Sequence, residues 1–177
     1  MRLTAIRRFT PATLLAAAIL AVPTAATAVP PTVDPPLEDF VFEVPEGQGC
    51  AEFPLGIEAT GSQSPIRTFY DRSGEVSRVL IAGQGYALTF SNPENDKELV
   101  LKPTGFSRTT VTREDGRQDV VDRGAFAIIL FPTDTPAGPA ATLYQGRAVY
   151  TLSADGSNTL ESLTASGRTT DICAALS

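Results

Sequence analysis

The chain contains no histidine, and this absence excludes several kinds of chemistry. Without an imidazole there is no Ser-His-Asp or Cys-His catalytic group, no histidine-bound zinc and no histidine acid-base catalysis. Lysine is nearly absent too: a Ser-Lys pair would need Lys97 or Lys102, and neither lies in a Ser-x-x-Lys motif. The composition therefore favours a protein that is not an enzyme, and we predict no catalytic residue, cofactor or metal.

Cysteine is also rare, because Cys50 and Cys173 are the only two in the chain. They lie near the two ends of the region that we expect to fold. A reactive thiol pair would favour a Cys-x-x-Cys spacing or a neighbouring histidine, and the chain has neither. The sequence therefore predicts a disulfide bond between Cys50 and Cys173, as expected in an oxidising compartment.

The start of the chain has the pattern of a secretory signal peptide. Basic residues are followed by an apolar stretch over 12–22 and by the small residues Ala26-Thr27-Ala28 at a cleavage site. The apolar stretch is shorter than the roughly 20 residues that a membrane span needs. We therefore predict a signal peptide over 1–28 and a secreted protein that leaves the membrane after cleavage. The Sec and twin-arginine routes both stay open.

The predicted mature chain is acidic. The leader holds three of the 14 basic residues and none of the 20 acidic ones, which leaves 11 basic against 20 acidic residues. Phosphate binding is driven by lysine and arginine, and no basic stripe is evident along the sequence. The composition therefore predicts that neither nucleic acid nor an anionic membrane is a partner.

Proline and alternating hydrophobicity define the organisation of the rest of the chain. Residues 29–38 (VPPTVDPPLE) are rich in proline, which predicts a disordered linker before a single domain over 39–177. From residue 39 onward, apolar and polar residues alternate with period two, and no segment sustains the helical period of 3.6. Asp115-Gly116 and Asp155-Gly156 are strong hairpin signals.

The alternating segments predict an all-β fold. About ten of them follow one another with short turns between, which is typical of an antiparallel meander. Such a meander closes most simply into an up-and-down barrel or a barrel-like sheet, and a two-sheet β-sandwich is the alternative. The segment 124–131 (GAFAIILF) is apolar on both faces and should form the most buried strand.

Acidic residues and tyrosines are the remaining candidates for a site. Asp122, Asp134 and Asp171 fall at predicted strand ends or loops, where turn or solvated carboxylates are the favoured interpretation. The tyrosines would either line a ligand cavity or belong to the core and rim; they are Tyr70, Tyr86, Tyr144 and Tyr150.

Two other local patterns resemble ligand sites but are better explained as turns. The oxygen-rich segments 92–96 and 155–158 do not follow a calcium-loop pattern. The two Gly-Gln-Gly sequences, at 47–49 and 83–85, are not followed by a helix that could bind phosphate. We therefore predict turns at all four places.

The chain contains a series of short motifs, most of them in its C-terminal half. They are Gly49-Cys50-Ala51-x-Phe53-Pro54, Asp115-Gly116-Arg117, Arg123-Gly124-x-Phe126, Leu130-Phe131-Pro132, Gly138-Pro139, Leu143-Tyr144-x-Gly146-Arg147 and the stretch from Ser166 to Ala174. In this order they resemble an uncharacterised family of small secreted actinobacterial proteins. The resemblance implies export and a β fold with two terminal cysteines, and it implies no catalytic or binding residue.

Three functions stay open at this point. The favoured hypothesis is a secreted, non-catalytic binding or interaction domain with a cavity for a small apolar ligand. The second is a carboxylate- or tyrosine-dependent hydrolase or isomerase on the same β scaffold. The third is a structural module of the cell surface with a cell-wall component as its partner.

Overall fold

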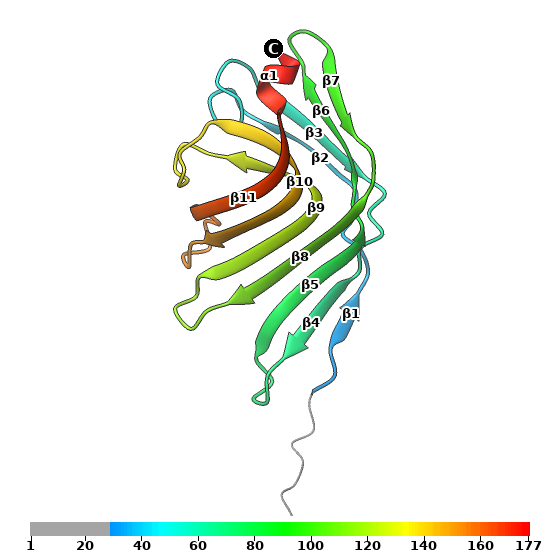
Figure 1. The fold of residues 1–177 in the computed structure, drawn as a ribbon, viewed down its shortest axis with the longest axis vertical. Helices are drawn as coiled ribbons and strands as arrows, with labels where there is room; N and C mark the ends of the chain where they lie inside the picture. Colours follow the sequence, from blue (N-terminus) through cyan, green and yellow to red (C-terminus); the bar gives the residue numbers. More distant parts are fainter. Residues whose placement is uncertain (1–28) are drawn as a thin grey trace, which may run out of the picture.

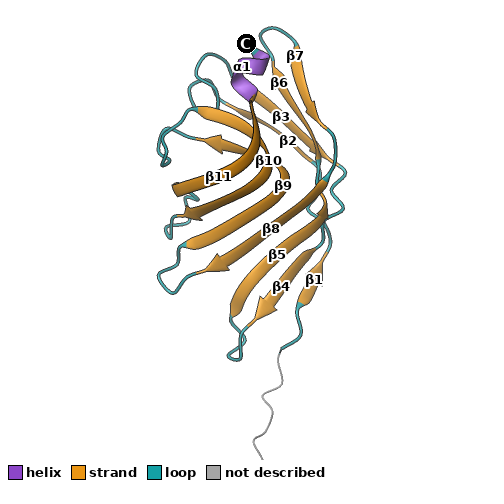
Figure 2. Ribbon diagram, viewed as in Figure 1, coloured by secondary structure: helices purple, strands orange, loops and turns teal. Residues whose placement is uncertain are grey.

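A computed structural model describes residues 29–177, and these residues form an almost entirely β structure (Figure 1, Figure 2). The predicted signal peptide over 1–28 lies outside the described residues. Two antiparallel sheets are present: sheet A has the strand order β1-β4-β5-β8-β9-β10-β11, and sheet B has the order β2-β3-β6-β7. In the part of the chain that the structure describes, no helix has the length and apolar character needed to cross a membrane.

The strands of sheet A are β1 (Thr32–Asp34), β4 (Ile66–Tyr70), β5 (Val76–Gln84), β8 (Gly105–Thr112), β9 (Gln118–Leu130), β10 (Ala140–Leu152) and β11 (Leu160–Asp171). The strands of sheet B are β2 (Phe40–Val44), β3 (Leu55–Thr60), β6 (Ala87–Asn92) and β7 (Lys97–Leu101). The short helix α1 (Ile172–Leu176) follows β11.

The two sheets share one continuous path of the chain. Strand β3 leads into β4, β5 into β6 and β7 into β8, so each of these pairs crosses from one sheet to the other. In sheet B strand β3 pairs with β6, and in sheet A their continuations β4 and β5 pair with each other. The two chain segments thus remain neighbours where they pass from one sheet to the other. The all-β prediction is therefore confirmed. Over residues 29–177 the strands do not close into a barrel, and the two-sheet alternative fits the structure.

Three glycines allow the long strands β9, β10 and β11 to bend (Figure 1). Gly124, Gly146 and Gly167 lie opposite one another in the register of these strands. Gly124 has φ +102°, and a Cβ atom there would collide with the carbonyl oxygen of Gly105. Position 124 therefore has no room for a side chain where β9 approaches Gly105, and glycine also accepts the positive φ.

The hydrophobic core lies on both faces of β9. On one face Ala125, Ala127 and Ile129 pack against the cluster formed with sheet B. The alternate residues, among them Phe126 and Ile128, belong to a second cluster together with buried residues of β10 and with Leu160. As predicted, residues 124–130 contribute to the core from both faces of the strand, whereas Phe131 follows the strand and is 39% exposed.

The predicted disulfide bond is present between Cys50 and Cys173, with Cα atoms 5.6 Å apart. It connects the β2–β3 loop to α1, whose Ile172 and Leu176 are buried in the same cluster as Cys50. The sequence did not predict α1, because five residues are too few to establish a helical period. The local signal is Asp171, whose side chain accepts a hydrogen bond from the Ala174 amide as an N-cap.

Strand β1 lies inside the segment 29–38, for which the sequence predicts a disordered linker. Thr32, Val33 and Asp34 pair with β4, and all three side chains remain exposed. Main-chain hydrogen bonds to β4 therefore hold the strand. Because such pairing does not require buried side chains, the sequence shows no apolar alternation that would predict it.

The hairpin turns lie where the Asp-Gly signals predict them. In the β10–β11 turn, hydrogen bonds from the hydroxyls of Ser153 and Ser157, each 2.7 Å from Oδ1 of Asp155, lower the pKa of that carboxyl to about 2. The ordinary pKa is 3.8. The ionised carboxylate therefore stabilises the folded state above about pH 4, and this contribution is lost as the pH falls toward 2.

The variant Asp155→Asn is expected to keep the turn while removing this titration. Its melting temperature should lie below that of the wild type at neutral pH, and the two should converge between about pH 4 and pH 2. Thermal unfolding followed by circular dichroism across this range measures the difference. A gap that stays constant down to pH 2 would contradict the assignment of the titration to Asp155.

Candidate functional site

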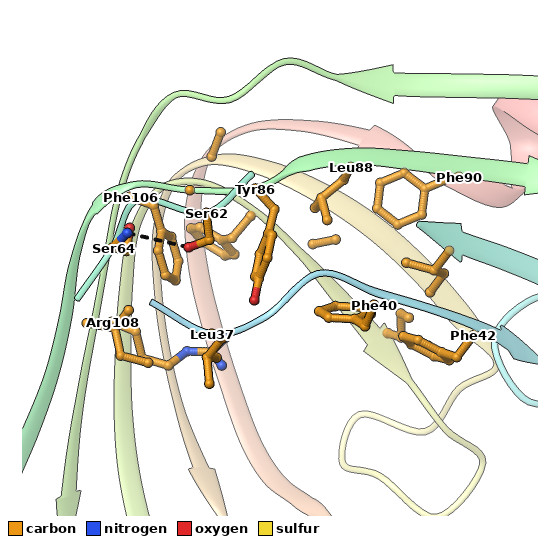
Figure 3. Close-up of a pocket in the computed structure, with 17 residues that line it drawn as sticks. Leu37, Phe40, Phe42, Ser62, Ser64, Tyr86, Leu88, Phe90, Phe106 and Arg108 are labelled. Carbon is orange, nitrogen blue, oxygen red and sulfur yellow. Dashed lines mark hydrogen bonds between the residues drawn. The ribbon is translucent and has the colours of Figure 1, made fainter. Parts of the chain in front are cut away.

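A largely apolar cavity of about 290 Å³ lies between the two sheets. Sheet B contributes Phe40, Phe42, Ile57, Leu88 and Phe90, and sheet A contributes Ile81, Phe106, Arg108, Ala125, Phe126, Ala127 and Ile129. Leu37, Ser62, Ser64, Gly85 and Tyr86 complete the wall from the connecting segments. Figure 3 shows Phe40 and Phe42 at one end of the cavity and Arg108 at the other, with Tyr86 between them.

The mouth of the cavity is formed by the segment that crosses from β1 to β2. Leu37, Phe40 and Phe42 are all partly exposed there. Two hydrogen bonds hold this segment: the Tyr86 hydroxyl donates to the Glu38 carbonyl at 2.9 Å, and Oδ1 of Asp39 accepts from the Gly61 amide at 2.6 Å. Burial and the nearby Asp39 carboxylate raise the pKa of Tyr86, so its hydroxyl stays protonated and can donate.

Arg108 is the charged residue in the cavity wall, and it is held by a buried carboxylate. Its Nε and Nη2 atoms each donate to one oxygen of Asp122 at 2.8 Å, in a two-pronged ion pair. The Asp122 side chain is 0% exposed, whereas that of Arg108 is 38% exposed. The pair therefore fixes the guanidinium in one orientation while leaving part of it accessible.

Tyr150 completes this polar cluster from β10. Its hydroxyl donates to Oδ2 of Asp122 at 3.1 Å. Burial raises the pKa of Tyr150 and outweighs the Arg108 guanidinium, which lowers it, while the Asp122 carboxylate raises it further. The hydroxyl therefore keeps its proton and acts as a hydrogen-bond donor to the carboxylate.

A second cavity of about 200 Å³ also reaches Arg108. Its wall includes Tyr150, Asp134, Asn158 and Leu160, on the side of β9 that faces the second hydrophobic cluster. Arg108 thus borders both cavities, and its guanidinium is the polar group common to them.

The predicted candidate carboxylates are dispersed, and each has a structural role. Asp122 lies in the middle of β9 rather than at a strand end, and Asp171 caps α1. Asp134 is buried in the β9–β10 loop, where its two oxygens accept hydrogen bonds from the amides of Phe131 at 2.7 Å and Leu160 at 2.8 Å. Asp134 therefore holds this loop over the end of β11.

The four tyrosines are not gathered in one site either. Tyr86 lines the main cavity and Tyr150 the smaller one. Tyr144 stacks on Phe126 with ring centroids 5.6 Å apart, and the Tyr70 hydroxyl lies 3.1 Å from that of Thr32. Tyr86 and Tyr150 thus line cavities, whereas Tyr144 and Tyr70 fit the core and rim interpretation.

Most of the remaining sequence candidates lie in turns, but the turn predicted at 83–85 is wrong, because Gly83 and Gln84 are the last residues of β5 and pair with β8. Segment 92–96 forms the β6–β7 turn, and segment 155–158 forms the β10–β11 turn. Lys97 donates to a carbonyl of Ser177, at the end of the helix α1. Between residues 29 and 177 no three His, Cys, Asp or Glu side chains are placed to hold a metal ion.

Sequence reasoning did not find Arg108 as a site residue. The signal existed only as a pair of opposite charges on two adjacent predicted strands, Arg108 before the Asp115-Gly116 turn and Asp122 after it. Counting outward from that turn would have placed them opposite each other, as the register does.

Comparison of the chain with models of known protein families, with curated proteins and with solved structures finds no match. The resemblance to secreted actinobacterial proteins therefore stays a prediction.

The geometry limits what this site can do chemically. Both oxygens of Asp122 already accept hydrogen bonds, and its side chain has no exposed surface from which to take a proton from a substrate. Tyr150 points its hydroxyl at the same carboxylate. The accessible part of the cluster is the guanidinium, which donates hydrogen bonds and accepts none.

Proposed function

We propose that this protein is a secreted, non-catalytic binding protein that holds a small, mainly apolar molecule with one hydrogen-bond acceptor. The observation that carries the proposal is the apolar cavity between the sheets with the Arg108 guanidinium in its wall. Apolar walls with a small number of fixed polar groups, of which Arg108 is the charged one here, are typical of pockets that bind and orient small molecules.

The size of the cavity supports a ligand of about two aromatic rings. A cavity of about 150 Å³ lined by aliphatic and aromatic residues is enough to bind benzene, and this cavity is about 290 Å³. Burial of apolar ligand surface would supply most of the binding free energy, at roughly 25 cal/mol per Å². The ligand's acceptor would bind N–H groups of the Arg108 guanidinium other than the two that donate to Asp122, which are on Nε and Nη2.

A matched series of three naphthalene compounds tests this proposal. We expect 1-naphthoate and 1-acetonaphthone, which carry an acceptor, to bind about 10-fold more tightly than naphthalene, because one charged donor contributes about 1.5 kcal/mol. Isothermal titration calorimetry of the purified protein measures the three affinities. If none of the compounds binds, the proposed function is wrong; if all three bind equally, the role of Arg108 is wrong.

Filling the cavity should block binding without harming the fold. Ala127→Leu adds side-chain volume to the cavity wall, so the affinity for 1-naphthoate should fall by at least about 10-fold, while stability stays equal or rises by about 1 kcal/mol. Val100→Leu is the control, because Val100 is 58% exposed on β7 and does not line the cavity. Equal binding by Ala127→Leu and the wild type would place the ligand elsewhere.

Native mass spectrometry of protein recovered from culture supernatant would identify the natural ligand. A bound mass that is lost in the Ala127→Leu variant but kept in Val100→Leu is the expected result. Recovery from the supernatant also tests secretion itself.

A further inference from the structure

The strand register gathers arginines on the outer face of sheet A. Arg123 of β9 lies directly opposite Arg147 of β10, and both are exposed. Because directly paired residues share a face, the two side chains emerge together, with Cβ atoms about 5 Å apart. Arg108 follows Ser107 by one position and Asp122 precedes Arg123 by one position, so this ion pair lies on the opposite side of the two strands, where Asp122 is fully buried.

The same face carries two more arginines at a distance. Arg67 of β4 belongs to a row of directly paired residues that runs across sheet A to Val149 of β10, two residues from Arg147. The intermediate members of this row are Leu80, Thr109 and Val121. Arg78 lies two residues before Leu80 and stacks over the ring of Phe69, with its guanidinium carbon 4.2 Å from the ring centroid. Arg67 and Arg78 therefore lie on the same face as Arg123 and Arg147, two to four strands away from that pair.

These four arginines have no carboxylate partner within residues 29–177. The ion pairs of that region are made by Arg108, Arg113 and Arg117. Asp119 also lies on the outer face of β9, but it is already paired with Arg113 at 2.6 Å. Two like charges directly opposite each other destabilise a sheet. This face of a chain with 20 acidic residues thus carries positive charges that no carboxylate in the described region neutralises.

Hydroxyl groups continue the row on both sides of the arginine pair. Ser107 of β8 is opposite Arg123, and Ser166 of β11 is opposite Arg147. Neighbouring strands are about 4.8 Å apart, so the row Ser107–Arg123–Arg147–Ser166 spans roughly 15 Å across four strands. All four side chains can donate hydrogen bonds to phosphate oxygens.

We propose that this row binds a linear polymer that carries phosphate groups, with Arg78 and Arg67 as further contacts across the same face. The row is roughly 15 Å long and further arginines lie on the same face, so an extended chain can make more contacts here than a single phosphate ion. Phe69, which lies beside Arg78 on this face, is covered by the Arg78 guanidinium and so is not open for base stacking. We therefore expect recognition to depend on phosphate contacts. The site is on the opposite face from Arg108 and is independent of the proposed function.

The probe for this proposal is inorganic polyphosphate with a fluorescent label, followed by anisotropy. The double variant Arg123→Gln/Arg147→Gln is expected to bind at least about 10-fold more weakly than the wild type. The control Arg72→Gln/Lys102→Gln removes the same charge from a turn and a loop outside the row, and it should bind within about two-fold of the wild type. Wild-type affinity should fall roughly 50-fold between about 50 and 200 mM salt if four phosphates are contacted.

The variant Arg147→Glu separates a binding role from a structural one. It places a carboxylate directly opposite Arg123, so the melting temperature should rise while polyphosphate binding is lost. Equal weakening of the double variant and its control would overturn the proposal, because only net charge would then matter. Absence of polyphosphate binding at low salt would also overturn it. Arginine-dependent binding to vesicles of anionic phospholipid, without binding to polyphosphate, would indicate a membrane surface instead and would overturn it too.

Discussion

Replacement of both bridged cysteines, Cys50→Ala/Cys173→Ala, is expected to lower the free energy of unfolding by roughly 4 kcal/mol. The bridge joins residues separated by 123 positions, so it removes much of the conformational freedom of the unfolded chain. Cys50 is fully buried in the main cluster, and alanine is used because a serine hydroxyl there would add an unsatisfied polar group.

Urea unfolding of the variant and the wild type at neutral pH measures this loss. Reduction of the wild type with dithiothreitol is the control, because it breaks the same bond without changing a residue. The variant and the reduced wild type should agree with each other. A difference below about 1 kcal/mol from the oxidised wild type would mean that packing around α1, and not the bridge, holds the two ends together.

Replacement of Arg108 with leucine is expected to lower the free energy of unfolding by about 3 kcal/mol, because it leaves the Asp122 carboxylate buried without its partner. The expected loss is at the lower end of the usual range, since the Arg108 end of the pair is partly exposed to water. Tyr150→Phe removes only the remaining hydrogen bond to Asp122 and should cost about 1 kcal/mol.

The double variant Arg108→Leu/Asp122→Leu is the decisive control for this prediction. It removes both charges, so most of the lost stability should return, as is found when buried ion pairs are replaced by apolar residues. The same protein should bind 1-naphthoate and naphthalene with equal affinity, because the donor is gone while the cavity remains. Stability as low in the double variant as in Arg108→Leu would show that Asp122 is not the reason for the loss.

Local sequence was sufficient for the strands, the turns and the disulfide bond. Alternation along 118–130 and the Asp115-Gly116 signal depend on residues close together, so their physical meaning does not require the fold. The pairing of Cys50 with Cys173 followed from their number. Strand β1 and helix α1 were missed because three exposed residues and five helical ones carry too little pattern.

The site was harder to predict because it depends on which strands are neighbours. Arg108 and Asp122 lie 14 residues apart, and Arg147 belongs to a third strand. Sequence reasoning treated the carboxylates singly and found no basic stripe, because the arginines of the outer face are spread from Arg67 to Arg147 along the chain. The Arg108–Asp122 pair could be found by counting outward from one hairpin turn, whereas the arginines of the outer face come together only through the register of several strands.

The disulfide bond also joins two segments that are far apart in the order of synthesis. The chain is synthesised from its N-terminal side, so Val44, Phe53 and Leu55 are made long before Ile172 and Leu176, which complete the same buried cluster. Cys50 has no partner until 123 further positions have been added. The core is therefore complete only when α1, which is far along the chain from the strands that it covers, packs against them.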